Sequence, residues 1–120
     1  MSWFIQSVLV VDDDDEVRAI TAETLRSVHL TVLEAGNGDE ALQILAEHAE
    51  IGVLFCDVLM PGINGAAVAV EARRRWPELQ IILTSGYVGG VVMRDVAFLP
   101  KPYAPRDVIK AVATRVKIGG

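Results

Sequence analysis

The sequence has few of the features that would place it in several common classes of protein. It contains a single cysteine, Cys56, so no intramolecular disulfide can form, which suits a reducing compartment. Its longest apolar runs are too short to cross a bilayer. The first residues, MSWFIQS, carry neither the basic cluster nor the cleavage site of a signal peptide. We therefore expect a cytoplasmic protein that does not contact membranes.

Positive charge is also scarce, which argues against a nucleic-acid-binding surface. The chain has 11 Lys and Arg against 16 Asp and Glu, giving a formal net charge of −5. Proteins that bind nucleic acids normally carry an excess of basic residues. The 120 residues are enough for one domain that buries its own core without a disulfide or a structural metal. We expect a single domain over residues 1–120.

Short apolar runs of strand length alternate with segments of helical periodicity. The runs lie at residues 8–11, 30–33, 53–56, 81–83 and 96–99. Helices are expected at about 16–28, from Gly38 or Asp39 onward, at about 65–75, and from Pro105 to near Lys117. Continuous apolar strands separated by helices predict a parallel sheet covered on both faces, which is a doubly wound α/β fold.

Four of these runs end in residues whose side chains can take part in chemistry. Asp12 and Asp13 follow the first run, and Asp57 follows the third. Thr84 ends the fourth run, and Lys101 follows the fifth. Because binding sites in open parallel sheets form at the carboxyl ends of the strands, we expect these side chains to gather at one edge.

Three neighbouring carboxylates repel one another, and a divalent cation would relieve that repulsion. An all-oxygen ligand set without a nearby His or Cys favours Mg²⁺ over Zn²⁺. A carboxylate beside Mg²⁺ and a lysine can accept a phosphoryl group and form an aspartyl-phosphate. Since such transfers depend mainly on positioning and charge neutralisation, the pattern predicts a Mg²⁺-dependent phosphoryl-transfer site.

Blocks at the same strand ends resemble the signature blocks of response-regulator receiver domains. They read VLVVDDD at 8–14, DVLMPGING at 57–65, LTSGY at 83–87 and FLPKPY at 98–103. The stretch EAGNGDEAL at 34–42 is similar to a fifth, structural block. The resemblance implies a flavodoxin-like (βα)5 fold with strand order 2-1-3-4-5. It also implies a phosphoacceptor domain of a two-component phosphorelay that catalyses only its own phosphorylation and dephosphorylation, and is otherwise no enzyme.

The resemblance assigns the phosphoryl chemistry to the acidic residues. It implies that Asp57 accepts a phosphoryl group from a phosphohistidine on a histidine kinase or a histidine phosphotransfer protein. Asp12, Asp13 and Asp57 would hold Mg²⁺, with the backbone carbonyl of Leu59 as a further ligand.

The resemblance also implies roles in signalling. The hydroxyl of Thr84 would contact a phosphoryl oxygen, and Lys101 would pair first with Asp57 and then with the phosphoryl group. Phe98 holds the position of a switch aromatic that moves inward when Thr84 moves, although the same residue suits an ordinary core position. The domain would then signal through contacts with a downstream protein target.

Residues beside the site have less specific interpretations. Asp14 and Asp15 fit a helix N-cap or a solvated loop, and Cys56 fits a small buried hydrophobic residue.

The chain departs from the family pattern between Thr84 and Lys101. Only 17 positions separate these residues, fewer than in most receivers, and Gly89-Gly90 disfavours a helix there. We therefore expect the fourth helix of the fold to be short, frayed or absent, which leaves a homodimer through that face an open question. The sequences of the blocks around Thr84 and Lys101 most resemble those of receivers in hybrid histidine kinases and of stand-alone receivers.

Three other functions fit parts of the pattern. A Mg²⁺-dependent phosphohydrolase usually needs a second carboxylate two positions after its nucleophile, where this chain has Leu59, and a cap for which the chain is too short. A flavodoxin-like FMN carrier needs a Ser/Thr/Gly-rich phosphate loop after the first strand, where four aspartates stand at 12–15. A degenerate, unphosphorylated interaction domain would not need the intact acidic set.

Overall fold

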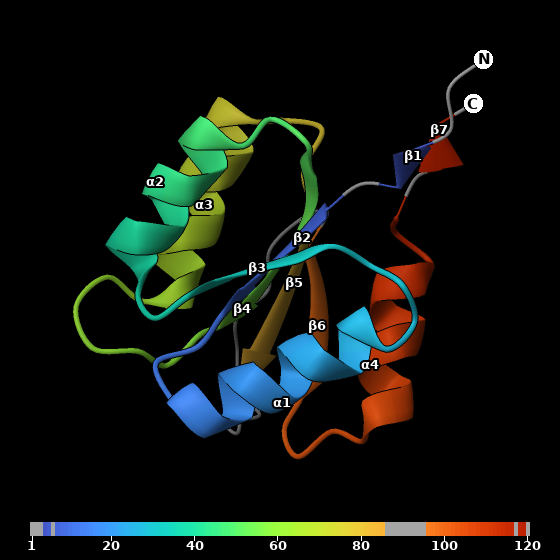
Figure 1. The fold of residues 1–120 in the computed structure, drawn as a ribbon. Coiled ribbons are helices and arrows are strands. Elements are labelled where there is room, and N and C mark those ends of the chain that lie inside the picture. Colours follow the sequence, from blue (N-terminus) through green and yellow to red (C-terminus); the bar gives the residue numbers. More distant parts are fainter. Residues whose placement is uncertain (1–3, 6, 86–95, 117, 120) are drawn as a thin grey trace.

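A five-stranded parallel sheet forms the centre of the protein (Figure 1). The structure is a computed structural model that describes residues 4–5, 7–85, 96–116 and 118–119. The strands of this sheet are β2 (Ser7–Val11), β3 (Val32–Ala35), β4 (Ile51–Asp57), β5 (Gln80–Ser85) and β6 (Val96–Pro100). Their spatial order is β3-β2-β4-β5-β6, which is the predicted order 2-1-3-4-5 when these five are counted along the chain. The predicted fold is therefore confirmed.

Helices in the described part of the chain cover both faces of the sheet (Figure 1). On one face lie α2 (Gly38–Glu47) and α3 (Gly65–Arg75), and on the other lie α1 (Asp15–Arg26) and α4 (Pro105–Ala113). Alternate residues of β2 enter the two resulting cores: Leu9 and Val11 pack on the α2–α3 side, and Val8 and Val10 on the α1–α4 side. Burial on both faces explains why these strands read as continuous apolar runs.

Three helices begin at side chains that accept backbone N–H groups. Asp14 Oδ1 accepts hydrogen bonds from the amides of Glu16 at 3.0 Å and Val17 at 3.1 Å. Asn37 and Asn64 cap α2 and α3 in the same way, through the amides three residues later. Such caps satisfy donors that a helix cannot pair internally. The interpretation of Asp14 as an N-cap is therefore confirmed.

Some predicted boundaries are wrong by a few residues. α1 ends at Arg26 rather than near residue 28, because the amides of Val28 and His29 turn back to Leu25 and Arg26. His29 has a positive φ of 69°, and β3 begins at Val32 rather than at residue 30. α4 ends at Ala113 instead of near residue 117. The fourth helix, expected to be short or absent, falls within residues 86–95 and lies outside the described residues.

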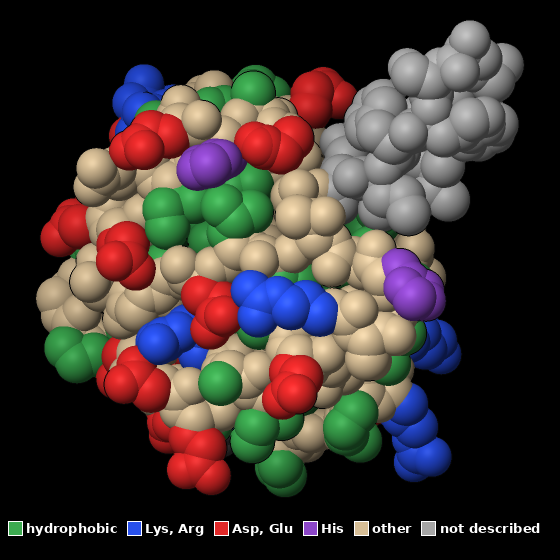
Figure 2. Space-filling view, viewed as in Figure 1, with side chains coloured by type: hydrophobic (Ala, Val, Ile, Leu, Met, Phe, Trp, Pro, Cys, Tyr) green, Lys and Arg blue, Asp and Glu red, His purple; other side chains and the backbone are tan. Residues whose placement is uncertain are grey.

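A second, two-stranded sheet was not predicted. β1 (Phe4–Ile5) pairs antiparallel with β7 (Ile118–Gly119), which brings the two ends of the described chain together beside α4 (Figure 1). Among the described residues, no helix has the length and apolar character needed to span a membrane. Acidic and basic side chains are interspersed on the face shown in Figure 2.

Candidate functional site

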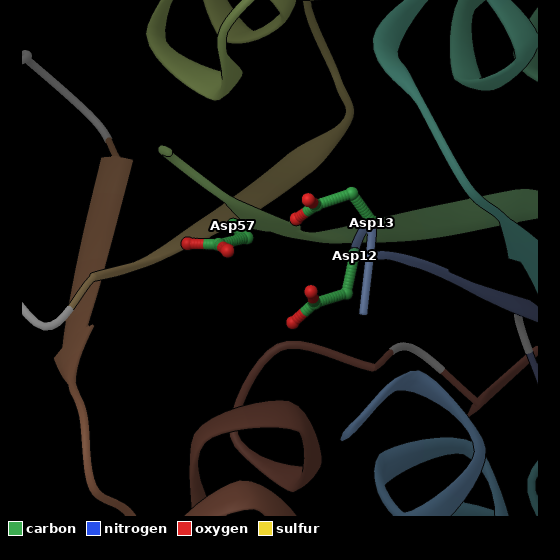
Figure 3. A group of neighbouring side chains, drawn as sticks. All are labelled: Asp12, Asp13 and Asp57. Atoms are coloured by element: carbon green, nitrogen blue, oxygen red, sulfur yellow. The ribbon is translucent and has the colours of Figure 1, made fainter. Parts of the chain in front are cut away.

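Three carboxylates meet at the carboxyl edge of the central sheet. Asp12 and Asp13 directly follow β2, and Asp57 is the last residue of β4. Each offers one oxygen, and these oxygens lie within 4.8 Å of one another. Asp12 and Asp57 are buried, whereas Asp13 is exposed. Figure 3 shows the Asp12 and Asp13 side chains directed from the end of β2 toward the side where Asp57 lies.

Strand register explains why these side chains meet. Val11 is the register partner of Cys56, so the residues that follow them, Asp12 and Asp57, leave adjacent strands at the same level. Asp57 is in turn paired with Thr84 on β5. Carboxyl ends of parallel strands lie at one edge of a sheet, which is where sites form in this class of fold. The predicted gathering of side chains is thus present.

Lys101 joins the two buried carboxylates. Its Nζ lies 3.2 Å from Asp57 Oδ2 and 3.3 Å from Asp12 Oδ2. Its backbone N–H donates to the carbonyl of Ser85 at 2.8 Å, which fixes the start of the loop to β5. The Lys101–Pro102 peptide bond is cis. The ammonium therefore lies between two strand ends and neutralises part of their combined charge.

The site holds more negative charge than one lysine compensates. Burial raises the pKa of Asp57, Lys101 opposes this rise, and the charge of Asp12 adds to it, so the pKa stays above its usual range. Burial alone would lower the pKa of Lys101, but the attraction of Asp12 and Asp57 outweighs it and raises that pKa. A carboxylate that resists ionisation beside another carboxylate favours the binding of a further cation.

The ligand chemistry of this cluster fits Mg²⁺. The three side chains offer only carboxylate oxygens, which hard cations prefer. Mg²⁺ commonly uses one or two carboxylates and keeps several waters, and the exposed Asp13 gives the cluster one carboxylate in contact with solvent. Asp57 would also be able to share the ion with a phosphoryl group bound beside it.

The loop between β4 and α3 is packed against Asp57. The amide of Leu59 donates to Asp57 Oδ1 at 3.3 Å, while the Leu59 side chain is 61% exposed. Gly65 approaches so closely that an added Cβ would lie 2.1 Å from the carbonyl oxygen of Asp57. Its amide donates to the carbonyl of Val58 at 2.9 Å. Gly65, the first residue of α3, therefore fixes the loop on the residue that ends β4, a role that the sequence pattern did not reveal.

The two residues expected to act as a switch lie in different environments. Thr84 is buried beside Asp57 at the end of β5. Phe98 lies on the neighbouring strand β6 and is 41% exposed, so an ordinary core position is wrong for it. Its exposure leaves it free to change its environment, and its motion stays a prediction.

One charged residue near the site was missed by the sequence pattern. Arg18, in α1, donates from Nη1 to the backbone carbonyl of Asp12 at 2.8 Å. No sequence motif marks an arginine six residues after Asp12, since the contact depends on the angle between α1 and β2. Cys56 is buried, as expected, and burial together with the charge of Asp57 raises its pKa far above the usual range.

Comparisons with known proteins agree on one family. The family model described as the response regulator receiver domain matches residues 8–113. The sensor kinase CckA of Brucella abortus is 36% identical over 118 residues, covering 92% of this chain and 12% of that protein. The crystal structure of the receiver domain from the hybrid histidine kinase CckA gives a TM-score of 0.81 at 36% identity, covering 91% of this chain and 97% of that one.

A solved structure of a more distant relative contains a ligand. The response regulator TrrA of Thermotoga maritima, in complex with Mg²⁺-BeF, gives a TM-score of 0.82 at 27% identity. The match covers 91% of this chain and 97% of that chain.

The chain spans only part of the curated relatives. It covers 12% of CckA and 25% of the hydrogenase transcriptional regulatory protein HoxA of Cupriavidus necator, to which it is 33% identical over 95% of its own length. The activities and partners of those longer proteins belong to them.

Proposed function

Since the chain belongs to the response regulator receiver domain family, the receivers of two-component systems, we propose that Asp57 is its phosphoacceptor and Mg²⁺ its cofactor. The observation that carries this proposal is the position of Asp57 at the end of β4, the middle strand of the sheet. Asp12 and Asp13 approach it from one neighbouring strand, and Thr84 from the other. A phosphoryl group on Asp57 would therefore have the carboxylates that would hold Mg²⁺ on one side and a hydroxyl donor on the other.

The proposed reaction transfers a phosphoryl group from a phosphohistidine of a histidine kinase or a histidine phosphotransfer protein. An oxygen of the Asp57 carboxylate forms the new bond to phosphorus as the bond between phosphorus and the imidazole nitrogen breaks. The imidazole keeps the electron pair of that bond. Bound Mg²⁺ supplies positive charge to the carboxylates and to the phosphoryl oxygens. The donor set agrees with this cofactor, as does the Mg²⁺-BeF complex of TrrA, a relative of the same fold.

The other site residues would neutralise the charge of the phosphoryl group or change conformation in response to it. Lys101 Nζ already lies 3.2 Å from Asp57 Oδ2, within reach of an oxygen of a phosphoryl group placed there. The Thr84 hydroxyl would contact another oxygen, and the backbone carbonyl of Leu59 would complete the metal site. Phe98, exposed on β6, would then change its environment as the two-state equilibrium shifts.

The proposed domain comprises residues 1–120 and acts in the cytoplasm through protein contacts. Its partners would be the phosphohistidine donor and a downstream protein target. Apart from its own phosphorylation and dephosphorylation we assign it no enzymatic turnover. A phosphohydrolase would require an acid or base two positions after Asp57, where the exposed side chain of Leu59 offers neither.

Phosphorylation by a small acyl-phosphate donor tests the proposal. The wild-type protein, Asp57→Asn and the control Asp39→Asn, which removes an exposed carboxylate from α2, are incubated with acetyl phosphate and Mg²⁺. Intact mass should show one added phosphoryl group on the wild type and on Asp39→Asn, and none on Asp57→Asn or when EDTA is present. Equal labelling of Asp57→Asn would refute the assignment, and equal labelling in EDTA would refute the role of the metal.

A further inference from the structure

The guanidinium of Arg18 connects the acidic loop, residues 12–14 between β2 and α1, to two other segments. Nη1 donates to the backbone carbonyl of Asp12 at 2.8 Å, and Nη2 donates to Asp15 Oδ1 at 2.7 Å. Nε lies 3.4 Å from Glu34 Oε1 on β3. The Arg18 side chain is only 18% exposed and its contact with the Asp12 carbonyl is partly buried, whereas the Asp15 side chain is 89% exposed. One side chain thus bridges the loop after β2, the first turn of α1 and the edge strand.

The carbonyl that Arg18 holds belongs to the peptide bond between Asp12 and Asp13. The backbone amide of Asp12 donates to the carbonyl of Ala35 at 3.2 Å. Both backbone polar groups of Asp12 are therefore tied to β3, the amide directly and the carbonyl through Arg18. Rotation of the Asp12–Asp13 peptide would redirect both carboxylates. The orientation of two of the three expected metal ligands therefore depends on this contact.

Three different nitrogen atoms of Arg18 reach three acceptors. The planar fork of a guanidinium can do this in one fixed arrangement, whereas the ammonium of a lysine is a single point charge. Arg26 offers a natural comparison, because its Nη1 lies 3.1 Å from Glu34 Oε2 while its Nη2 donates to the backbone carbonyl of Val32 at 2.8 Å, within β3. The two arginines share one carboxylate partner and differ in their connection to the site.

We propose that Arg18 is a positioning residue that orients the Asp12–Asp13 peptide and thereby sets the affinity of the site for Mg²⁺. This inference rests on the proposed function, since it concerns the same acidic cluster. Residues that orient metal ligands typically change metal affinity by about 10- to 100-fold when they are replaced.

The direction in which the Mg²⁺ affinity changes when Arg18 is replaced distinguishes a positioning role from a purely electrostatic one. A positive charge near the acidic cluster repels Mg²⁺, so removing the charge of Arg18 without any structural role would tighten Mg²⁺ binding. Loss of a positioning contact would weaken it instead. Arg18→Lys keeps the charge but not the fork, so positioning predicts that lysine does not restore affinity.

Titration with Mg²⁺, followed by amide chemical shifts, tests the proposal on the wild type, Arg18→Gln, Arg18→Lys and Arg26→Gln. We expect the dissociation constant to rise about 10-fold in both Arg18 variants and to stay near the wild-type value in Arg26→Gln. Unchanged or tighter binding in Arg18→Gln, or full recovery in Arg18→Lys, would overturn the proposal. Should the Arg18 variants not fold, Glu34→Gln removes one anchor of Arg18, and unchanged affinity there would also count against it.

A measurement without metal gives an independent readout. The amide of Asp14 donates to Asp12 Oδ1 at 2.9 Å, so its hydrogen exchange in EDTA reports the conformation of the acidic loop. We expect faster exchange in the Arg18 variants and wild-type exchange in Arg26→Gln, and equal exchange in all of them would overturn the proposal. A wild type that binds no Mg²⁺ would instead contradict the proposed function itself.

Discussion

Replacement of Gly65 by alanine should disturb the site through the backbone. An added Cβ would lie 2.1 Å from the carbonyl oxygen of Asp57 and 2.8 Å from the Cα of Val58. Backbone atoms of a central strand cannot move aside as the end of a flexible side chain can, so the loop must shift by roughly an ångström to reach ordinary contact. That shift also strains the hydrogen bond from the Gly65 amide to the Val58 carbonyl.

The expected cost is at the upper end of the range for overpacking. Insertion of one methyl group into a tightly packed position typically costs about 1–3 kcal/mol, and we expect about 3 kcal/mol here because three backbone atoms lie within 2.8 Å of the added Cβ. Gly62 provides a matched control in the same loop. It has a φ of +78° but nothing within 4 Å of an added Cβ, so Gly62→Ala should cost only the conformational strain of about 1–2 kcal/mol.

Urea unfolding of the two alanine variants in EDTA, followed by circular dichroism, measures this difference. Gly65→Ala should also accept a phosphoryl group from acetyl phosphate more slowly, because the shifted loop carries Leu59, whose amide donates to Asp57 Oδ1 at 3.3 Å. A free energy of unfolding equal to that of Gly62→Ala would refute the reasoning from close approach. Normal stability combined with slow phosphorylation would refute the link between the two effects.

Three other substitutions have expected outcomes. Lys101→Met should slow phosphorylation of Asp57 by acetyl phosphate about 100-fold, measured by intact mass, while Mg²⁺ titration still shows binding. Asp57→Asn should raise the melting temperature in EDTA at neutral pH. The raised pKa of Asp57 means that its ionised form destabilises the fold, and this gain should vanish in melts below about pH 4, where the carboxyl is protonated. Leu54→Ala, in the buried centre of β4, should lower the free energy of unfolding by about 2–5 kcal/mol in urea.

The meeting of the site's side chains at one edge of the sheet could be predicted from the sequence because they follow buried strands. Asp12, Asp57 and Thr84 end runs that are apolar on both faces, and the parallel register then brings them to one edge. The same logic predicted the place of Lys101 after β6. Residue type and strand position decide these placements, whatever the packing of the helices.

Features that depend on tertiary geometry could not be predicted. The contact of Arg18 with the Asp12 carbonyl depends on how α1 crosses the sheet, and the approach of Gly65 to Asp57 depends on the path of the loop. β3 begins later than its apolar pattern suggests, because Leu30 packs against the core from the turn before the strand. The exposure of Phe98 was equally hidden, since an aromatic residue in an apolar run suits either a core or a surface.

The identity of the phosphorylated residue tests the central claim most directly. Three carboxylates lie together, so the mass of the intact protein alone does not distinguish them. Borohydride reduces an aspartyl-phosphate to homoserine, which marks the acceptor in a peptide sequenced by tandem mass spectrometry. After treatment with acetyl phosphate and Mg²⁺, we predict homoserine at position 57 alone. Homoserine at Asp12 or Asp13, with Asp57 unmodified, would contradict the account.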